Sequence, residues 1–151
     1  MRILVVEDDH IQADWIKKKL QDAFAQTHGG VELIVINTES EFRTRLPELA
    51  NSLPDVIVMD VMLRWADPSP DLARPPQDVI QEGFYRAGLR CERLLASDPR
   101  TSSIPVVLYT VLDSNAMDHE ITNLRPNVKY LPKSSDVEPL AKMIRELTTA
   151  E

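Results

Sequence analysis

Polar side chains capable of chemistry follow short apolar runs of the chain. Glu7 and Asp8 come directly after "ILVV" at 3–6, and Asp60 comes directly after "VIVM" at 56–59. Three carboxylates gathered in one pocket would repel one another, and they favour a hard divalent cation such as Mg²⁺, which binds oxygen ligands. A carboxylate held by such a cation can itself act as a nucleophile and form an acyl phosphate.

A hydroxyl and an ammonium group follow two further apolar runs. Thr110 ends "VVLYT", and Lys133 follows "YLP". Opposite a bound cation, these groups suit the oxygens of an added phosphoryl group, which need hydrogen bonds and neutralisation of their charge. The sequence contains no Gly-rich phosphate loop, Cys/His metal cluster or Ser-His-Asp pattern that would predict a different chemistry.

These residues can meet only if the apolar runs are parallel strands of one sheet. The runs alternate with stretches that have helical signals, such as 11–24, where apolar residues recur near one face. Strands that alternate with helices form right-handed βαβ units and a parallel sheet with helices on both faces. Ligands bind at the carboxyl edge of such a sheet, so we expect Glu7, Asp8 and Asp60 to converge there.

Three other segments carry weaker signals. "VELIVI" at 31–36 is a candidate edge strand, and 113–124 begins with capping residues and predicts a helix. The segment 64–87 holds four of the eleven prolines, so its first half is expected to be irregular. From Gln77 onward it is expected to add turns to the helix that follows.

Composition indicates one soluble globular domain. The chain has 151 residues, 43% of them hydrophobic and 27% charged, with a formal net charge of −7. An acidic protein is unsuited to bind nucleic-acid phosphates directly, and no apolar stretch is long enough to span a membrane. Cys91 is the one cysteine and cannot form an intramolecular disulfide, so we expect a cytoplasmic protein.

In four motifs the chain resembles the receiver domain of two-component response regulators. The motifs are "ILVVEDD", "PDVIVMDVML", "GLRCERLLASDPRTSSIPVVLYT" and "YLPKS". The resemblance covers roughly residues 1–63 and 88–147. It implies a flavodoxin-like three-layer α/β sandwich, with a five-stranded parallel sheet of order 2-1-3-4-5. The chain would then be a single receiver domain over 1–151, with a Pro-rich insert at about 64–87.

The resemblance also implies roles for individual residues. Asp60 would accept a phosphoryl group from a phosphohistidine on a histidine kinase or a histidine phosphotransfer protein. Mg²⁺ would be held by Glu7, Asp8, Asp60 and the backbone carbonyl of Met62. Thr110 and Lys133 would bind the phosphoryl oxygens, and Thr110 would act with Tyr130 as the switch that changes the surface around 113–147. Asp9, the next acidic residue, is expected to cap a helix.

The chain departs from the usual receiver pattern at several positions. Ser134 stands where a Pro commonly follows the lysine, so we expect this loop to differ. Arg64 stands where a Pro commonly follows the phosphoacceptor strand, and Val111 is larger than the usual small residue. Met62 and Leu112 have no polar group to orient a water molecule, so we expect slow self-dephosphorylation.

Two interpretations of function remain open from the sequence. The first is a phosphorylated switch that signals to an unknown downstream protein. The second is a pseudo-receiver, which binds a protein partner without being phosphorylated. The segment 64–87 is equally open, because it can be a passive expansion or a lid or docking element in which Trp65 and the prolines take part.

Overall fold

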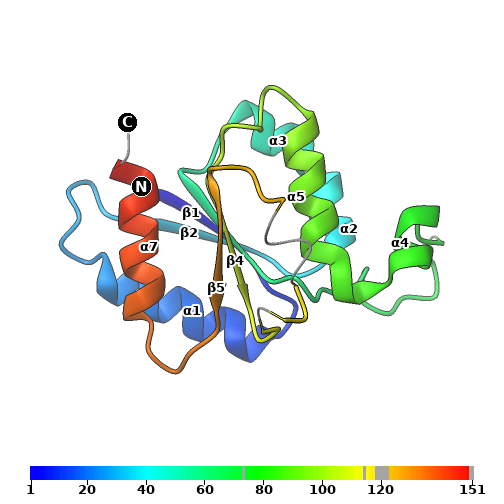
Figure 1. Ribbon diagram of the computed structural model, residues 1–151, viewed down its shortest axis with the longest axis horizontal. Helices are drawn as coiled ribbons and strands as arrows, with labels where there is room; N and C mark the ends of the chain where they lie inside the picture. Colours follow the sequence, from blue (N-terminus) through cyan, green and yellow to red (C-terminus); the bar gives the residue numbers. More distant parts are fainter. Residues whose placement is uncertain (73, 114, 118–122, 150–151) are drawn as a thin grey trace.

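The core of the molecule is a sheet of five parallel strands in the order β2-β1-β3-β4-β5 (Figure 1). The computed structural model describes residues 1–72, 74–113, 115–117 and 123–149. The strands are β1 (Arg2–Val6), β2 (Glu32–Ile36), β3 (Val56–Met59), β4 (Val106–Thr110) and β5 (Val128–Pro132). The flavodoxin-like topology expected from the resemblance is therefore confirmed, and "VELIVI" supplies the edge strand β2.

The strands are aligned so that their carboxyl ends reach one edge of the sheet. Val6 pairs with Met59 of β3, Met59 pairs with Leu108 of β4, and Leu108 pairs with Tyr130 of β5. The residues that follow β1, β3 and β4 therefore emerge side by side. The central strands are apolar and buried along their length because both of their faces are covered.

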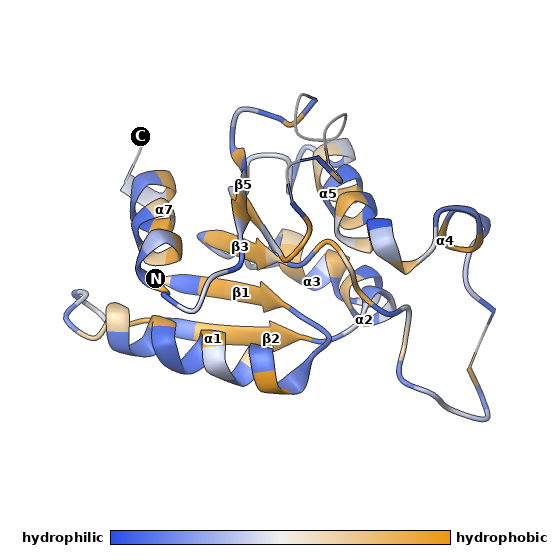
Figure 2. Cartoon of the chain, turned by 60° about the horizontal axis from the view of Figure 1, so that its bottom comes forward, coloured by the Kyte–Doolittle hydropathy of each residue, from blue (hydrophilic) through white to orange (hydrophobic). Residues whose placement is uncertain are grey.

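Helices cover both faces of the sheet (Figure 1). One face carries α1 (His10–Ala23) and α7 (Glu138–Thr149), and the other carries α2 (Glu39–Thr44), α3 (Leu46–Asn51) and α5 (Ala87–Ser97). Successive strand residues point to opposite faces, so Ile3 packs with Leu20, whereas Leu4 packs with Phe42 and Leu95. Figure 2 shows helices that are apolar on one side only. Within the described residues, no helix has the length and apolar character needed to cross a bilayer.

The connection from β4 to β5 spans residues 111–127. The helix expected over 113–124 cannot be compared in full, because 114 and 118–122 lie outside the described residues. Among the described residues of this connection, the Asp113 carboxylate accepts a hydrogen bond from the Ala116 N–H, at 2.8 Å.

A long connection joins β3 to α5. It contains α4 (Gln77–Glu82) and the 3-10 turn η1 (Phe84–Arg86). We expected helical turns from Gln77 to run into the following helix, but Gly83 separates them with a φ of +77°. A residue in this conformation cannot continue a right-handed helix, and glycine adopts it without steric cost. Figures 1 and 2 show α4 and the segment before it projecting away from the sheet.

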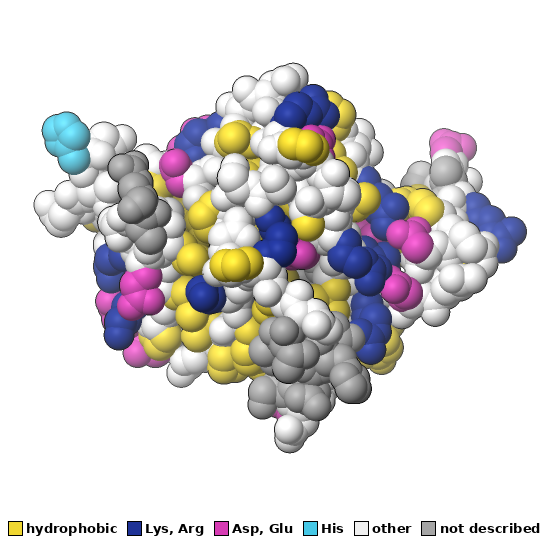
Figure 3. Space-filling view, turned by 45° about the horizontal axis from the view of Figure 1, so that its top comes forward, with side chains coloured by type: hydrophobic (Ala, Val, Ile, Leu, Met, Phe, Trp, Pro, Cys, Tyr) yellow, Lys and Arg dark blue, Asp and Glu magenta, His cyan; other side chains and the backbone are white. Residues whose placement is uncertain are grey.

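A buried ion pair anchors the second half of this connection to the body. Arg90 of α5 donates to Glu39 of α2 through Nη2 at 2.6 Å and through Nε at 3.0 Å, and both residues are buried. The Arg90 Nη1 atom donates to the Gly83 carbonyl at 2.7 Å. Arg43 donates to both Glu39 and Asp78 of α4, at 2.9 Å each. Figure 3 shows basic and acidic side chains next to each other where α4 meets the body.

The first residues of the connection are fixed by the backbone of α2. The Glu39 N–H donates to the Arg64 carbonyl at 3.1 Å, and the Ser40 N–H donates to the Trp65 carbonyl at 2.8 Å. The Arg43 guanidinium also lies 5.6 Å from the centre of the Trp65 ring, a cation–π contact. Helix α2 therefore holds both ends of the connection.

Helix α5 approaches the end of β3 so closely that position 88 favours glycine. A Cβ on Gly88 would lie 2.1 Å from the Asp60 carbonyl oxygen and 2.8 Å from the Cα of Val61. The Gly88 N–H also donates to the Val61 carbonyl at 2.9 Å. The contact is between backbones, so neither side can rotate out of the way.

We expect Gly88→Ala to lower the free energy of unfolding by about 3 kcal/mol, the upper end of the cost of overpacking. Urea denaturation would measure the change. Ser97→Ala, at the exposed end of the same helix, is the control and should change stability by less than about 1 kcal/mol. Equal stability of Gly88→Ala and wild type would mean that α5 can withdraw from β3 at no cost.

Candidate functional site

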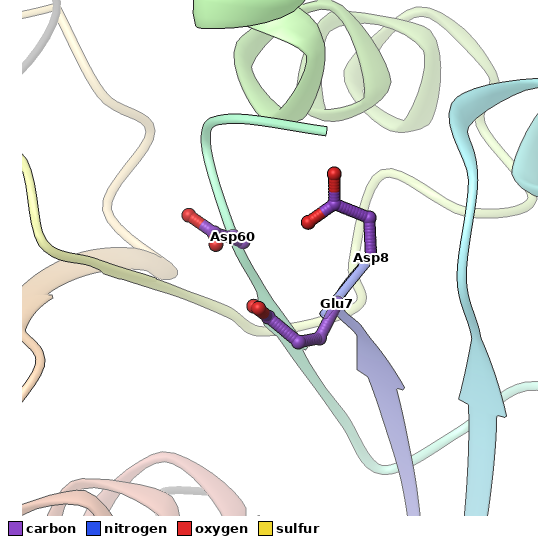
Figure 4. A group of neighbouring side chains, drawn as sticks. All are labelled: Glu7, Asp8 and Asp60. Carbon is purple, nitrogen blue, oxygen red and sulfur yellow. The ribbon is translucent and has the colours of Figure 1, made fainter. Parts of the chain in front are cut away.

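Three carboxylates meet at the carboxyl edge of the sheet. Glu7 and Asp8 follow β1, and Asp60 follows the neighbouring strand β3 (Figure 4). One carboxylate oxygen from each residue lies within 4.8 Å of the others. Glu7 and Asp60 are buried, with 2% and 5% of their surface exposed, and Asp8 is partly buried. These hard oxygen donors, close together and shielded from bulk water, fit a divalent cation.

Lys133 lies among the acids and offsets their mutual repulsion. Its Nζ atom donates to the Glu7 Oε2 and Asp60 Oδ2 atoms, at 2.9 Å each, and to the Gln12 Oε1 atom at 2.6 Å. An ammonium group has three hydrogens, so these three acceptors satisfy it fully. Asp60 is held on its other side as well, because its Oδ1 atom accepts hydrogen bonds from the Val61 and Met62 N–H groups.

Burial and charge shift the titration of this pocket. Burial, together with a hydrogen bond and repulsion from Asp60, raises the pKa of Glu7 to about 8, although Lys133 opposes the shift. Burial alone would lower the pKa of Lys133, but the charges of Asp60 and Glu7 raise it above its usual value. Around neutral pH the Glu7 carboxyl therefore retains its proton in much of the protein, and Lys133 stays charged.

A pocket of about 250 Å³ opens over these groups. Its lining residues are Glu7, Asp8, Asp9, Gln12, Asp60, Met62, Phe84, Val111 and Lys133. The four predicted metal-site residues and the predicted lysine are thus brought together. Thr110 and Tyr130 do not line the pocket.

Both predicted switch residues bond to Leu112 instead. Thr110 is fully buried at the end of β4, and its Oγ1 atom accepts a hydrogen bond from the Leu112 N–H at 3.2 Å. The Tyr130 hydroxyl donates to the Leu112 carbonyl at 2.6 Å. The backbone of one residue in the β4–β5 connection therefore links Thr110 to Tyr130.

The loop after β5 brings Lys133 to the acids without the usual proline. The Lys133 N–H donates to the Thr110 carbonyl at 2.8 Å, which extends the pairing of β4 and β5 by one residue. The Ser134 N–H donates to the Tyr109 hydroxyl at 3.4 Å. No cis peptide bond occurs in the described part of the chain. Asp9, as expected, caps α1 by accepting from the Ile11 and Gln12 N–H groups.

Sequence reasoning missed Gln12, Arg64 and Phe84 at this site. The Arg64 N–H donates to Asp8 Oδ2 at 3.0 Å, and its Nη2 atom donates to the Asp8 carbonyl at 2.7 Å. A basic residue four positions after the predicted phosphoacceptor was a usable signal for Arg64. Gln12 looked like any polar residue on a helix, and Phe84 is separated from the acids by the whole β3–α5 connection.

Comparisons with known proteins agree with the fold. No protein-family model matches the chain. The response regulator PleD of Caulobacter vibrioides is 30% identical over 148 residues, which make up 97% of this chain. The chain spans about a quarter, 26%, of the length of PleD.

Solved structures show the same fold. A signal receiver domain of a histidine kinase from Clostridium thermocellum matches with a TM-score of 0.68 and 16% identity, over 99% of this chain and 98% of that one. The Mn²⁺-bound form of response regulator Rcp1 matches with a TM-score of 0.60 and 22% identity, over 99% and 96% of the two chains. The sequence match and the strand order support one conclusion: this chain has the fold of a receiver domain and is similar in sequence to the response regulator PleD.

Proposed function

We propose that this receiver domain accepts a phosphoryl group on Asp60 and uses the modification to change a protein-binding surface. The observation that carries the proposal is the meeting of Glu7, Asp8 and Asp60 with Lys133 in one partly enclosed pocket. A purely structural role gives no reason to bury carboxylates next to one another, because each buried charge costs desolvation energy. The donor would be a phosphohistidine of a histidine kinase or a histidine phosphotransfer protein, and the setting the cytoplasm.

The residues of the pocket would have separate roles in phosphoryl transfer. Glu7, Asp8, Asp60 and the Met62 carbonyl would hold Mg²⁺, which neutralises charge on the phosphoryl oxygens when it is bound. An Asp60 carboxylate oxygen forms the new bond to phosphorus, and the electron pair of the broken P–N bond returns to the donor imidazole. Lys133 turns from the Asp60 carboxylate to a phosphoryl oxygen, so its ammonium charge stays compensated throughout.

The Thr110–Leu112–Tyr130 chain of hydrogen bonds offers a route from the pocket to the surface. If Thr110 turns its hydroxyl toward the phosphoryl group, the Leu112 N–H loses its acceptor. The backbone at Leu112 can then shift, which breaks the bond from the Tyr130 hydroxyl. Phosphorylation need only favour one of two existing arrangements of the surface at 113–147 to change which downstream protein binds.

Incubation with Mg²⁺ and acetyl phosphate, followed by intact mass measurement, tests the proposal. We expect one added phosphoryl group on the wild-type protein. Asp60→Asn should take up none because it lacks the nucleophilic oxygen, and wild type in EDTA should take up none because the cation is removed. Absence of phosphoryl uptake, even from histidine kinases, together with absence of Mg²⁺ binding, would support the pseudo-receiver instead.

Mg²⁺ binding should depend on pH because the cation must displace the proton of Glu7. The raised pKa of about 8 means that apparent affinity increases with pH up to about 8 and then levels off. The slope should approach tenfold per pH unit below that value, as expected for the release of one proton. Calorimetric titration at several pH values would measure it. Glu7→Gln, which has no proton to release, should bind more weakly and with a flat profile, and a flat profile in wild type would contradict the prediction.

Lys133→Met should affect phosphoryl transfer and metal binding in opposite directions. Uptake from acetyl phosphate should slow by about 10²-fold, the usual cost of losing a positioned donor to the reacting group. Mg²⁺ affinity should rise, because the cation no longer competes with an ammonium group for the carboxylates. Lys129→Met, at an exposed position on β5, is the matched control. Weakening of both properties in Lys133→Met would indicate a structural lysine.

A further inference from the structure

Phe84 is an aromatic residue of the β3–α5 connection that lines the pocket over Asp60. Of the residues that line this pocket, Phe84 is the one that lies between α4 and α5. With Met62 and Val111 it forms the apolar part of a lining that also contains the acids and Lys133. Half of its surface, 50%, is exposed, so the residue stands at the mouth of the pocket and not in the core.

The chain holds Phe84 in this place through its backbone and its neighbours. The Phe84 carbonyl accepts a hydrogen bond from the Leu63 N–H at 3.1 Å, directly after the loop that carries Met62. On the other side, Gly83 turns the chain with its positive φ, and Arg90 fixes the Gly83 carbonyl at 2.7 Å. Because Arg90 is itself fixed by the buried Glu39 carboxylate, the position of Phe84 is set by the core.

The neighbouring aromatic residue lies against a different pocket. The rings of Phe84 and Tyr85 are stacked, with 4.1 Å between their centres. Tyr85 lines a second pocket with Val61, Leu89 and Met117, and it does not line the pocket over Asp60. Tyr85 is 58% exposed, similar to Phe84, so the two residues differ in location more than in burial. Because Tyr85 is the stacking partner of Phe84, the matched control is Ile80 of α4, an exposed apolar residue of the same connection that lines neither of these two pockets.

We propose, building on phosphorylation of Asp60, that Phe84 restricts the access of water to the aspartyl phosphate and so prolongs its lifetime. In hydrolysis, the oxygen of a water molecule bonds to phosphorus, and the bond to Asp60 breaks with its electron pair returning to the carboxylate. The water releases a proton to solvent, and inorganic phosphate leaves. Phe84, Met62 and Val111 have no side-chain hydrogen-bonding group strong enough to hold that water in place, and the Phe84 ring occupies space at the mouth through which it would arrive.

The decay of the phosphorylated protein measures this effect directly. Wild type, Phe84→Ala, Phe84→Leu and Ile80→Ala are phosphorylated with acetyl phosphate and Mg²⁺ and freed of donor, and the remaining phosphoryl group is followed by intact mass. We expect Phe84→Ala to lose it on the order of 3- to 10-fold faster, because water gains entry to a desolvated site. Phe84→Leu, which keeps apolar bulk, should decay at a rate near that of wild type, and so should Ile80→Ala. Mg²⁺ affinity from calorimetry should be the same in all four proteins.

The possible outcomes separate this inference from the function on which it rests. Equal decay of wild type and Phe84→Ala would overturn the role of Phe84 and leave phosphorylation of Asp60 intact. Faster decay in Ile80→Ala as well, or a change in Mg²⁺ affinity in Phe84→Ala, would show a general disturbance of the connection and also overturn it. Absence of phosphoryl uptake by all four proteins, from acetyl phosphate and from histidine kinases, would overturn the proposed function and this inference together.

Discussion

The placement of three carboxylates in one pocket, two of them bonded to a single ammonium group, is the constraint on which the rest of the structure depends. Glu7, Asp8 and Asp60 come from two adjacent strands. Lys133, from the far end of the sheet, pairs with Glu7 and Asp60, and Arg64 pairs with Asp8. The strand alignment, the tight contact at Gly88 and the pairing of Lys133 with Thr110 all fix the three acids and Lys133 relative to one another. Because the Lys133 ammonium group pairs with two of the acids, a divalent cation and a phosphoryl group can bind here by replacing these charge pairs with new ones.

A second group of buried charges serves the long connection between β3 and α5. The buried Glu39–Arg90 pair joins α2 to α5, and Arg43 links Glu39 to Asp78 of α4. Removing one member of a buried pair typically costs several kcal/mol, since the other charge is left uncompensated. The protein therefore uses ion pairs for two purposes, one chemical at the carboxyl edge and one architectural beside it. The two meet at the backbone around Gly83 and Phe84.

The fold and the main acids were predictable because they depend on local patterns. Buried parallel strands are short apolar runs, and a reactive residue directly after such a run must lie at the carboxyl edge, so Glu7, Asp8, Asp60 and Lys133 could be placed together. Contacts between residues distant in sequence left no such pattern. Arg90 resembled a surface residue of an amphipathic helix, although it is 1% exposed. The break at Gly83 was missed because a glycine within a helical pattern does not reveal the sign of its φ.

Because helix α2 and Arg90 fix both ends of the β3–α5 connection, its middle can vary without disturbing the chemistry. The entropy of closing a loop grows only slowly with its length, so insertions or deletions between Trp65 and Gln77 would change stability little. Substitutions there would alter the surface offered to a partner, while the carboxylates stay in place. The anchored connection thus keeps the geometry of the acidic site independent of the surface that the middle of the connection presents, so this surface can diverge among related chains at low risk.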